Sequence, residues 1–375
     1  MKKSLGLYIH IPFCRSKCLY CDFCSFPRPK DELVDAYLRA LERDLIQKSD
    51  LCREYEVDTV YFGGGTPTSL PGELLPRLLD TVTAHYRISE NAEITAECNP
   101  TTENLSLFRA MRASGFNRLS VGVQSLHEKE LKALGRIHSF SDVERTFSDA
   151  RAAGFSNLSA DVMFGIPHQT PESYLQTLEG LAALEISHLS AYGLQIEEGT
   201  PFHRMEKSLP LPDEDAAERM YFEGIELLSR HGLEQYEISN FAKEGYESRH
   251  NLKYWSCDEY LGFGVAAHSD FCGERFGNSR DLNAYIEGRE ITEERESISF
   301  EERKNEYVML RMRLADGVRA SDFEARFGES FPDTFGARLK KYEASGLVHM
   351  TEEGAAFTPR GMYLSNAILS DILDF

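Results

Sequence analysis

The sequence predicts an α/β protein in which an open, partial (β/α)6 barrel is followed by a smaller α+β, winged-helix-like C-terminal domain. Six short runs of β-branched and aromatic residues alternate with amphipathic helical patterns over the first two-thirds of the chain, which is typical of parallel sheets with right-handed crossovers. Polar or glycine-rich segments follow these runs directly, where such barrels bind their ligands. The alternation stops near Pro210, and the end of the chain shows helical patterns around one predicted hairpin.

These changes of pattern divide the 375 residues into three parts: a barrel (1–210), an extension that begins with an acidic amphipathic helix (211–298) and the winged-helix-like domain (299–375). Gly115 and Gly154 follow two predicted helices, where glycine favours the left-handed conformation that ends a helix. The predicted strands are Leu5–Ile11, Val57–Phe62, Glu93–Cys98, Arg118–Gln124, Asn157–Phe164 and His188–Ile196. The predicted helices are Glu32–Gln47, Gly72–Tyr86, Thr102–Ala113, Asp142–Ala153 and Pro171–Leu184.

The composition is that of an ordinary globular protein and argues against several classes of function. Hydrophobic residues make up 42% of the chain, and no apolar run approaches the length needed to cross a bilayer. The net charge of −20 argues against a nucleic-acid partner. The first residues lack the pattern of a secretory signal peptide. We therefore expect a cytoplasmic protein whose isolated Cys52, Cys98, Cys257 and Cys272 are free thiols.

The first predicted strand runs directly into a cysteine-rich loop, within the sequence YIHIPFCRSKCLYCDFC. Cys14, Cys18 and Cys21 form a CxxxCxxC motif. Three thiolates at this spacing can each bind one iron of a [4Fe-4S] cluster and leave the fourth iron open to a chelating cofactor. A zinc site with Cys24 or His10 as fourth ligand is the alternative. Disulfides fit poorly, because the cysteines are close neighbours on one loop.

Polar side chains and glycines also follow the later predicted strands. Because the carboxyl ends of the strands meet at one mouth of the barrel, we expect these groups to surround a single site. Glycines let backbone amides approach a ligand, and a carboxylate on an inward strand position needs a partner. One alternative is that the two carboxylates and the arginine pair with one another. The groups are Gly63–Thr68, Glu97, Gln124, Arg136 and Asp161.

Together these motifs resemble the oxygen-independent coproporphyrinogen III oxidase-like branch of the radical S-adenosylmethionine (SAM) enzymes. The resemblance rests on YIHIPFC, CxxxCxxC, YFGGGTPT, SVGVQS, GRIHS and DVMFGIP followed by QTPESY, and it covers nearly the whole chain. It implies a radical-SAM barrel with a [4Fe-4S] cluster on Cys14, Cys18 and Cys21. His10, in the HIP signature, is the candidate catalytic residue, with a structural histidine as the alternative. The implied SAM contacts are Tyr8, Tyr20, Gly64, Gly65, Thr66, Glu97, Gln124, Arg136 and Asp161.

The string HNLKYW, which begins at His250, contains the only tryptophan, Trp255. A neutral imidazole is a good ligand for haem iron, and Tyr254 and Trp255 can pack on a porphyrin face. On the residues alone, a buried structural histidine is the alternative. The string resembles the signature of the haem chaperones of this branch, the HemW-like proteins, and this resemblance implies haem contact through His250. The following Gly262–His268 is predicted to be a close-packed loop, with His268 a second candidate ligand.

Two functions from different classes remain open. In the first, the protein is a chaperone that binds haem and delivers it to haem-accepting respiratory proteins. In the second, it is an oxidase that decarboxylates two propionates of coproporphyrinogen III to vinyl groups. The oxidases resemble CxxxCxxCxC, whereas Phe23 occupies the position two residues after Cys21, and Cys24 lies one place later. This departure favours the haem chaperone, although Cys24 keeps the oxidase as the alternative.

Overall fold

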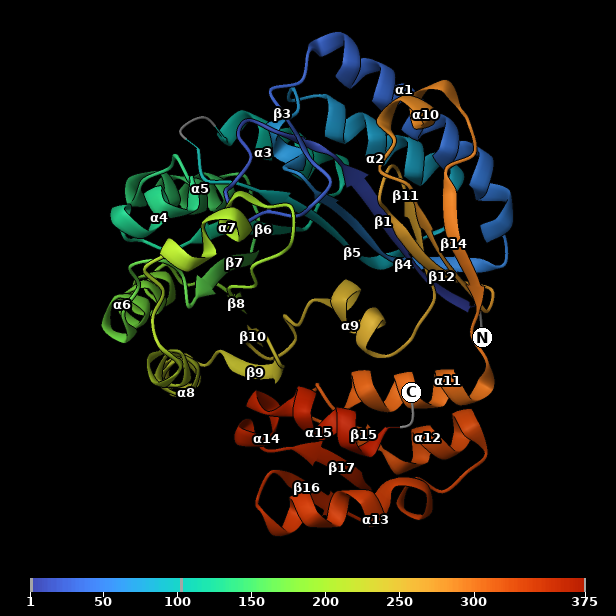
Figure 1. Ribbon diagram of the computed structural model, residues 1–375. Helices are drawn as coiled ribbons and strands as arrows, with labels where there is room; N and C mark the ends of the chain where they lie inside the picture. The colour runs from blue at the N-terminus through green and yellow to red at the C-terminus, as the bar shows by residue number, and fades with distance from the viewer. Residues whose placement is uncertain (1–2, 102–103, 374–375) are drawn as a thin grey trace.

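In the computed structural model, which describes residues 3–101 and 104–373, a parallel barrel wall lies above a smaller helical domain (Figure 1). The six neighbouring strands of the wall are parallel, and their order in the sheet is their order in the chain. They confirm the predicted partial (β/α)6 barrel. The strands are β1 (Lys3–Ile11), β4 (Tyr55–Gly64), β5 (Ile88–Cys98), β6 (Arg118–Gln124), β7 (Asn157–Phe164) and β8 (His188–Gly193).

Helices cover the outer face of this wall. Gly115 and Gly154 have φ of 118° and 96°, which confirms the predicted left-handed helix ends. Ser139 and Thr170 begin their helices with capping boxes, which satisfy backbone N–H groups of the first turn. Thr102, where the third helix was predicted to begin, lies outside the described residues. The helices are α1 (Asp31–Lys48), α2 (Leu74–His85), α3 (Leu105–Ser114), α4 (Glu128–Leu134), α5 (Phe140–Ala152) and α6 (Pro171–Ala182).

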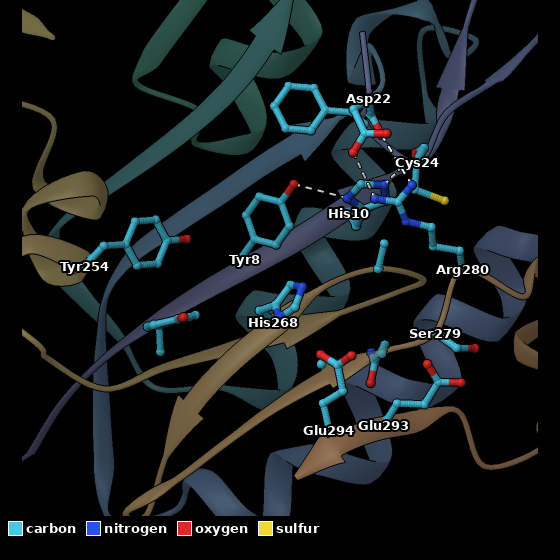
Figure 2. Close-up of a pocket in the computed structure, with 15 residues that line it drawn as sticks. Tyr8, His10, Asp22, Cys24, Tyr254, His268, Ser279, Arg280, Glu293 and Glu294 are labelled. Atoms are coloured by element: carbon cyan, nitrogen blue, oxygen red, sulfur yellow. Dashed lines mark hydrogen bonds and ion pairs between the residues drawn. The ribbon is translucent and has the colours of Figure 1, made fainter. Parts of the chain in front are cut away.

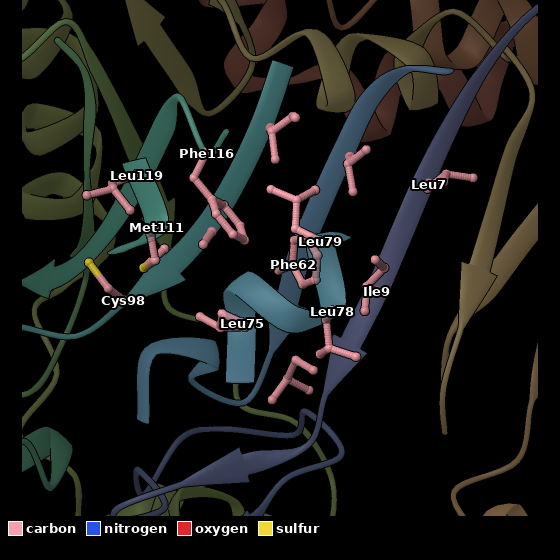
Figure 3. Close-up of a cluster of buried hydrophobic side chains, with 14 of the residues drawn as sticks. Leu7, Ile9, Phe62, Leu75, Leu78, Leu79, Cys98, Met111, Phe116 and Leu119 are labelled. Atoms are coloured by element: carbon pink, nitrogen blue, oxygen red, sulfur yellow. The ribbon is translucent and has the colours of Figure 1, made fainter. Parts of the chain in front are cut away.

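The main core lies between the strands and these outer helices, as Figure 3 shows for β1, β4 and α2. Leu7 and Ile9 of β1 are fully buried against it. Since alternate residues of a strand point to opposite faces, Tyr8 and His10 are directed to the inner face of the barrel. Each buried aliphatic side chain contributes roughly 1.5–3 kcal/mol. The apolar residues of β1 therefore fix which of its side chains face the inside.

Residues 211–298 extend the same sheet at both edges, so that it has twelve strands. At the β8 end of the barrel wall, β10 pairs antiparallel with β8. At the β1 end, β11 pairs parallel with β1. The predicted loop at Gly262–His268 is instead the end of β11, a short turn and the first residue of β12, because main-chain pairing with β1 orders Gly262 and Phe263. The elements are α7 (Pro201–Met205), α8 (Glu214–Arg230), β9 (Glu234–Glu237), β10 (Asn240–Ala242), α9 (Arg249–Trp255), β11 (Tyr260–Phe263), β12 (His268–Phe271), β13 (Glu274–Asn278), α10 (Leu282–Glu287) and β14 (Thr292–Ser297).

The C-terminal domain has its own core, in which Phe323, Phe327, Phe331 and Phe335 pack together. Its three-stranded sheet contains the predicted hairpin, β16–β17. In Figure 1 this domain lies on the side of α9 away from the barrel. Among the described residues, no helix combines the length and the apolarity needed to span a membrane. The elements are α11 (Phe300–Arg311), β15 (Val318–Arg319), α12 (Ala320–Phe327), α13 (Phe331–Ala344), β16 (Val348–Thr351), β17 (Gly354–Phe357), α14 (Pro359–Tyr363) and α15 (Ser365–Ile372).

Candidate iron–sulfur and SAM site

The mouth of the barrel encloses a cavity of about 510 Å³, here called the cysteine cavity. Its volume is in the range of small-molecule sites, about 300–1,000 Å³. Strand ends and loops that are far apart in the sequence meet there, as the barrel geometry predicts. The predicted site residues that line it are Cys14, Cys18, Tyr20, Cys21, Gly64, Gly65, Thr66, Glu97, Gln124, Arg136 and Asp161.

The loop that carries the cysteines is fixed by main-chain hydrogen bonds to the glycine-rich segment after β4. Gly65 N–H donates to Ile11 O at 2.8 Å, and Thr66 N–H donates to Phe13 O at 2.8 Å. A Cβ on Gly65 would lie 2.6 Å from Phe13 O. This glycine therefore permits the close approach of two chain segments, whereas the sequence suggested the approach of a ligand. The two short strands β2 (Phe13–Cys14) and β3 (Phe26–Pro27) close the base of the loop.

The three cysteines face the cavity without forming a site for a single ion. Burial raises the pKa of the Cys14 and Cys21 thiols, so binding iron there releases protons. In the part of the chain that the structure describes, no three His, Cys, Asp or Glu side chains are grouped to hold one metal ion. A zinc site needs such a group, whereas each thiolate of a cluster binds a different iron. Cys24 lines a different cavity, so the arrangement fits the cluster.

Two half-buried carboxylates, Glu97 and Asp161, lie on the inner wall of the cysteine cavity. Glu97 accepts hydrogen bonds from the Tyr61 hydroxyl at 3.0 Å and from Gly64 N–H at 3.1 Å. Burial, reinforced by the charge of Asp161, raises the pKa of Glu97 to about 7. Asp161 accepts from the Ser120 hydroxyl at 2.9 Å, and burial raises its pKa as well. A bound cation, such as a sulfonium, would favour the ionised form of both groups.

Two buried arginines, Arg118 and Arg136, bring positive charge to this cavity, and Lys17 lines it as well. Arg136 donates to Asn99 Oδ1 at 2.6 Å and to the Tyr20 hydroxyl at 3.1 Å. The pairing of Arg136 with Glu97 or Asp161, which the sequence left open, is absent from the described structure. The Nε–H groups of Arg136 and Arg118 are buried there without a hydrogen-bond partner. Because unsatisfied buried donors are costly, these groups fit an anionic part of a ligand, such as a carboxylate.

Sequence reasoning missed several polar residues of the cysteine cavity. Tyr61, Asn99, Arg118 and Ser120 all line it. The arginine at the start of a predicted barrel strand, Arg118, was the available signal, because a charged residue there needs a buried polar environment. Gln124 is buried with φ of 65°, at a register shift near the end of β6. A left-handed non-glycine residue is costly and occurs most often at functional sites.

Tyr8 and His10 line a second cavity of about 720 Å³, here called the hairpin cavity (Figure 2). It lies between the cysteine loop, β1 and residues of β11–β14, and it shares Asp22 and Phe23 with the cysteine cavity. His10 Nε2 lies 2.9 Å from Cys24 O, and Nδ1 lies 3.1 Å from the Tyr8 hydroxyl. Burial lowers the pKa of His10 to about 4. The imidazole of His10 is therefore neutral and hydrogen-bonded at both ring nitrogens, at the end of β1.

His250 lines neither cavity. Its Nδ1 lies 2.8 Å from Thr59 Oγ1, its Nε2 lies 2.8 Å from the Tyr254 hydroxyl, and its ring stacks on Tyr61. The residue is only 1% exposed, and burial lowers its pKa to about 3. In this conformation both ring nitrogens are engaged. Haem ligation by His250 stays a prediction, and it requires the ring to leave Thr59 and Tyr254.

The HNLKYW string forms most of helix α9, which is tightly anchored beneath the barrel. The Glu93 carboxylate accepts the backbone N–H groups of Arg249 and His250, each at 3.1 Å. Lys253 is 4% exposed and pairs with Asp58 at 2.8 Å. From this anchored helix, the string contributes Asn251 to the cysteine cavity and Tyr254 to the hairpin cavity.

Comparisons with known proteins agree with this geometry. The family model of the radical SAM superfamily matches residues 8–181, and that of the HemN C-terminal domain matches residues 298–364. The chain is 36% identical over 374 residues to "Heme chaperone HemW" of Bacillus subtilis (strain 168), with 98% of each chain covered. The chain belongs to the HemW family of radical SAM proteins. It is also 35% identical to "Heme chaperone HemW" of Escherichia coli (strain K12), with 97% of each chain covered.

Membership of this radical SAM family implies a [4Fe-4S] cluster, which the CxxxCxxC motif predicted, and SAM, which the resemblance implied. A solved structure of coproporphyrinogen III oxidase (HemN) from Escherichia coli superimposes with a TM-score of 0.87 at 25% identity. The match covers 99% of this chain and 90% of the oxidase chain. The HemW family thus shares its architecture with an oxidase, and the fold alone does not choose between carrier and enzyme.

Proposed function

We propose that this protein binds haem and delivers it to haem-accepting respiratory proteins, while the cysteine cavity holds the [4Fe-4S] cluster and SAM. The position of α9 carries the proposal, since its HNLKYW string contributes a side chain to each of the two cavities. A carrier with resident cofactors needs one site for them and another for its cargo. The two curated HemW relatives, named as haem chaperones, support the same reading.

Within the cysteine cavity, the charges suggest how SAM is oriented. When bound there, the cluster supplies one electron and an open iron for a chelating ligand. Glu97 and Asp161 offer negative charge to the sulfonium and hydrogen-bond acceptors to the ribose. Arg136, held by Asn99 and Tyr20, offers a positive partner to the SAM carboxylate. The chain's own role is to bind and orient SAM.

We expect SAM to bind more tightly as the pH rises from about 6 to about 8. The free protein holds a proton on Glu97 up to a pKa of about 7, and Arg118 and Asp161 are the charged groups that act on it. The cationic sulfonium favours the ionised carboxylate, so binding below pH 7 releases a proton. The dissociation constant should fall about tenfold in total between pH 6 and pH 8, with most of the change below pH 7. Calorimetry in buffers of different ionisation enthalpy measures both the affinity and the released proton.

Two variants make this test specific. Glu97→Gln should bind SAM more weakly, with an affinity that no longer changes between pH 6 and 8. Glu237→Gln is the matched control, because burial also raises the pKa of Glu237 to about 7, but this side chain does not line the cysteine cavity. A pH dependence that persists in Glu97→Gln and disappears in Glu237→Gln would show that the wrong carboxylate has been assigned.

The oxidase alternative is tested by turnover. We expect reconstituted protein, given SAM, a reductant and coproporphyrinogen III without oxygen, to form no protoporphyrin product by fluorescence-detected chromatography. The same preparation should bind hemin and transfer it to an apo-haem protein. In support, Phe23 stands where the oxidase pattern has a further cysteine, and Cys24 lines the hairpin cavity instead. Formation of protoporphyrin together with 5′-deoxyadenosine would replace the carrier with the decarboxylase.

A further inference from the structure

The histidines near the two cavities differ in whether the nitrogen atoms of their imidazole rings are already hydrogen-bonded. The ring nitrogens of His250 and His10 are all engaged, as described above. His268, the first residue of β12, is exposed at the wall of the hairpin cavity. Within residues 3–101 and 104–373, its ring makes no hydrogen bond or ion pair. Of these three histidines, His268 alone presents free nitrogen atoms to a cavity.

The position of His268 is fixed by a neighbouring glycine rather than by polar partners. His268 pairs with Gly277 across β12 and β13. A Cβ on Gly277 would lie 2.8 Å from Cε1 and 2.9 Å from Nδ1 of the ring. The imidazole therefore lies flat on the glycine backbone, where a larger residue would displace it. Figure 2 shows the ring inside the hairpin cavity, between Tyr254 and Arg280.

The rest of the hairpin cavity suits a flat aromatic ligand whose acidic groups lie on the Arg280 side. Tyr8, Tyr254 and Tyr260 provide aromatic surface, and Tyr254 belongs to the HNLKYW string. Arg280 is the positively charged residue that lines this cavity. Its ion pair with Asp22, at 3.2 Å, is solvent-exposed. Exposed ion pairs are weak, so the guanidinium is available to a carboxylate of a ligand. Glu293 and Glu294 lie on β14, and they disfavour propionates on that side.

We propose that haem binds in the hairpin cavity with His268 as an axial ligand of the iron and with its propionates towards Arg280. This assignment rests on the proposed haem-carrier function and adds a cargo site to it. The cavity volume of about 720 Å³ lies within the range of small-molecule sites, about 300–1,000 Å³. Because Asp22 and Phe23 line both cavities, the cargo would lie directly beside the cluster-bearing loop.

The test is a hemin titration of reconstituted full-length protein, followed by optical difference spectra against haem-free protein and by electron paramagnetic resonance. The wild type should show the spectrum of imidazole-ligated iron. In His268→Gly this spectrum should be lost and the affinity should fall at least about tenfold, the effect of losing even an outer partner of a metal ligand. Added free imidazole should restore the spectrum in His268→Gly, which loss of a merely structural side chain would not allow.

His349→Gly is the matched control, because His349 is likewise exposed on a short strand but lies in the C-terminal domain. It should bind hemin as the wild type does. Gly277→Ala keeps His268 in the sequence but should shift the iron spectrum, because the added methyl group would displace the imidazole ring. If wild-type protein binds hemin and His268→Gly keeps the same spectrum and affinity, the assignment is overturned but the carrier function stands. If the wild type binds no hemin, both are overturned.

Discussion

Replacing Cys18 with Ser is expected to abolish the brown chromophore that forms when the protein is reconstituted with iron and sulfide under anaerobic conditions. Cys14, Cys18 and Cys21 face one cavity, and no fourth thiol lines it beside them within the described chain except that of the buried Cys98 on β5. When one of the three thiolates is replaced by a hydroxyl, which is a poor iron ligand, one iron of the [4Fe-4S] cluster loses its protein ligand. Iron should fall from about four per chain to below about one, as measured by a colorimetric iron assay and the visible spectrum.

Two further cysteine variants separate this effect from general damage. Cys272→Ser changes an exposed thiol elsewhere in the sheet extension and should keep the full iron content. Cys24→Ser should also keep it, because this thiol lines the hairpin cavity. Loss of iron in Cys24→Ser equal to that in Cys18→Ser would make Cys24 a ligand and would reopen the zinc alternative. Retention of about four iron atoms by Cys18→Ser would mean that the loop has been misread.

Local patterns were sufficient to predict the barrel wall. The predicted bounds of β6 and β7 agree with the structure, because each alternates apolar residues with small or polar ones and ends at a polar or glycine-rich segment. The four strands β11–β14 were missed, since each is only four to six residues long. Their order depends on pairing between Leu7 and Leu261, which are far apart in the chain, and no local pattern encodes such a contact.

The same long-range pairing explains which of the predicted site residues lie together in one cavity. Residues at the ends of β4–β7 meet in the cysteine cavity because the barrel rule needs only the strand order. Tyr8 and His10 belong to β1, and β11 adds a neighbour on its outer side, so a second cavity opens beside them. Sequence reasoning treated β1 as the first strand of the wall and assigned all its polar residues to one mouth. The engagement of His250 by Thr59 likewise depends on packing between α9 and β4.

Replacing Gly65 with Ala is expected to damage the cluster site although no ligand atom is removed. An alanine Cβ at this position would lie 2.6 Å from Phe13 O, 2.7 Å from Phe13 N and 2.9 Å from Ile11 O. These are backbone atoms of the segment that leads into Cys14, and they cannot move aside as a flexible side chain can. The hydrogen bonds from Gly65 and Thr66 to this segment would lengthen or break. We expect a loss of about 1–3 kcal/mol from overpacking, together with lower iron content after reconstitution.

Gly72→Ala provides the control for this prediction, because a Cβ on Gly72 has no neighbouring atom within 4 Å. Urea unfolding and iron analysis of the two variants should therefore diverge: Gly72→Ala should behave as the wild type, and Gly65→Ala should lose both stability and iron. Wild-type iron content in Gly65→Ala would show that the glycine-rich segment can separate from Phe13 without disturbing the cysteines. The segment would then serve SAM by exposing its backbone amides, as the sequence first suggested. Loss of iron would instead identify it as the support that holds the cysteine loop in place.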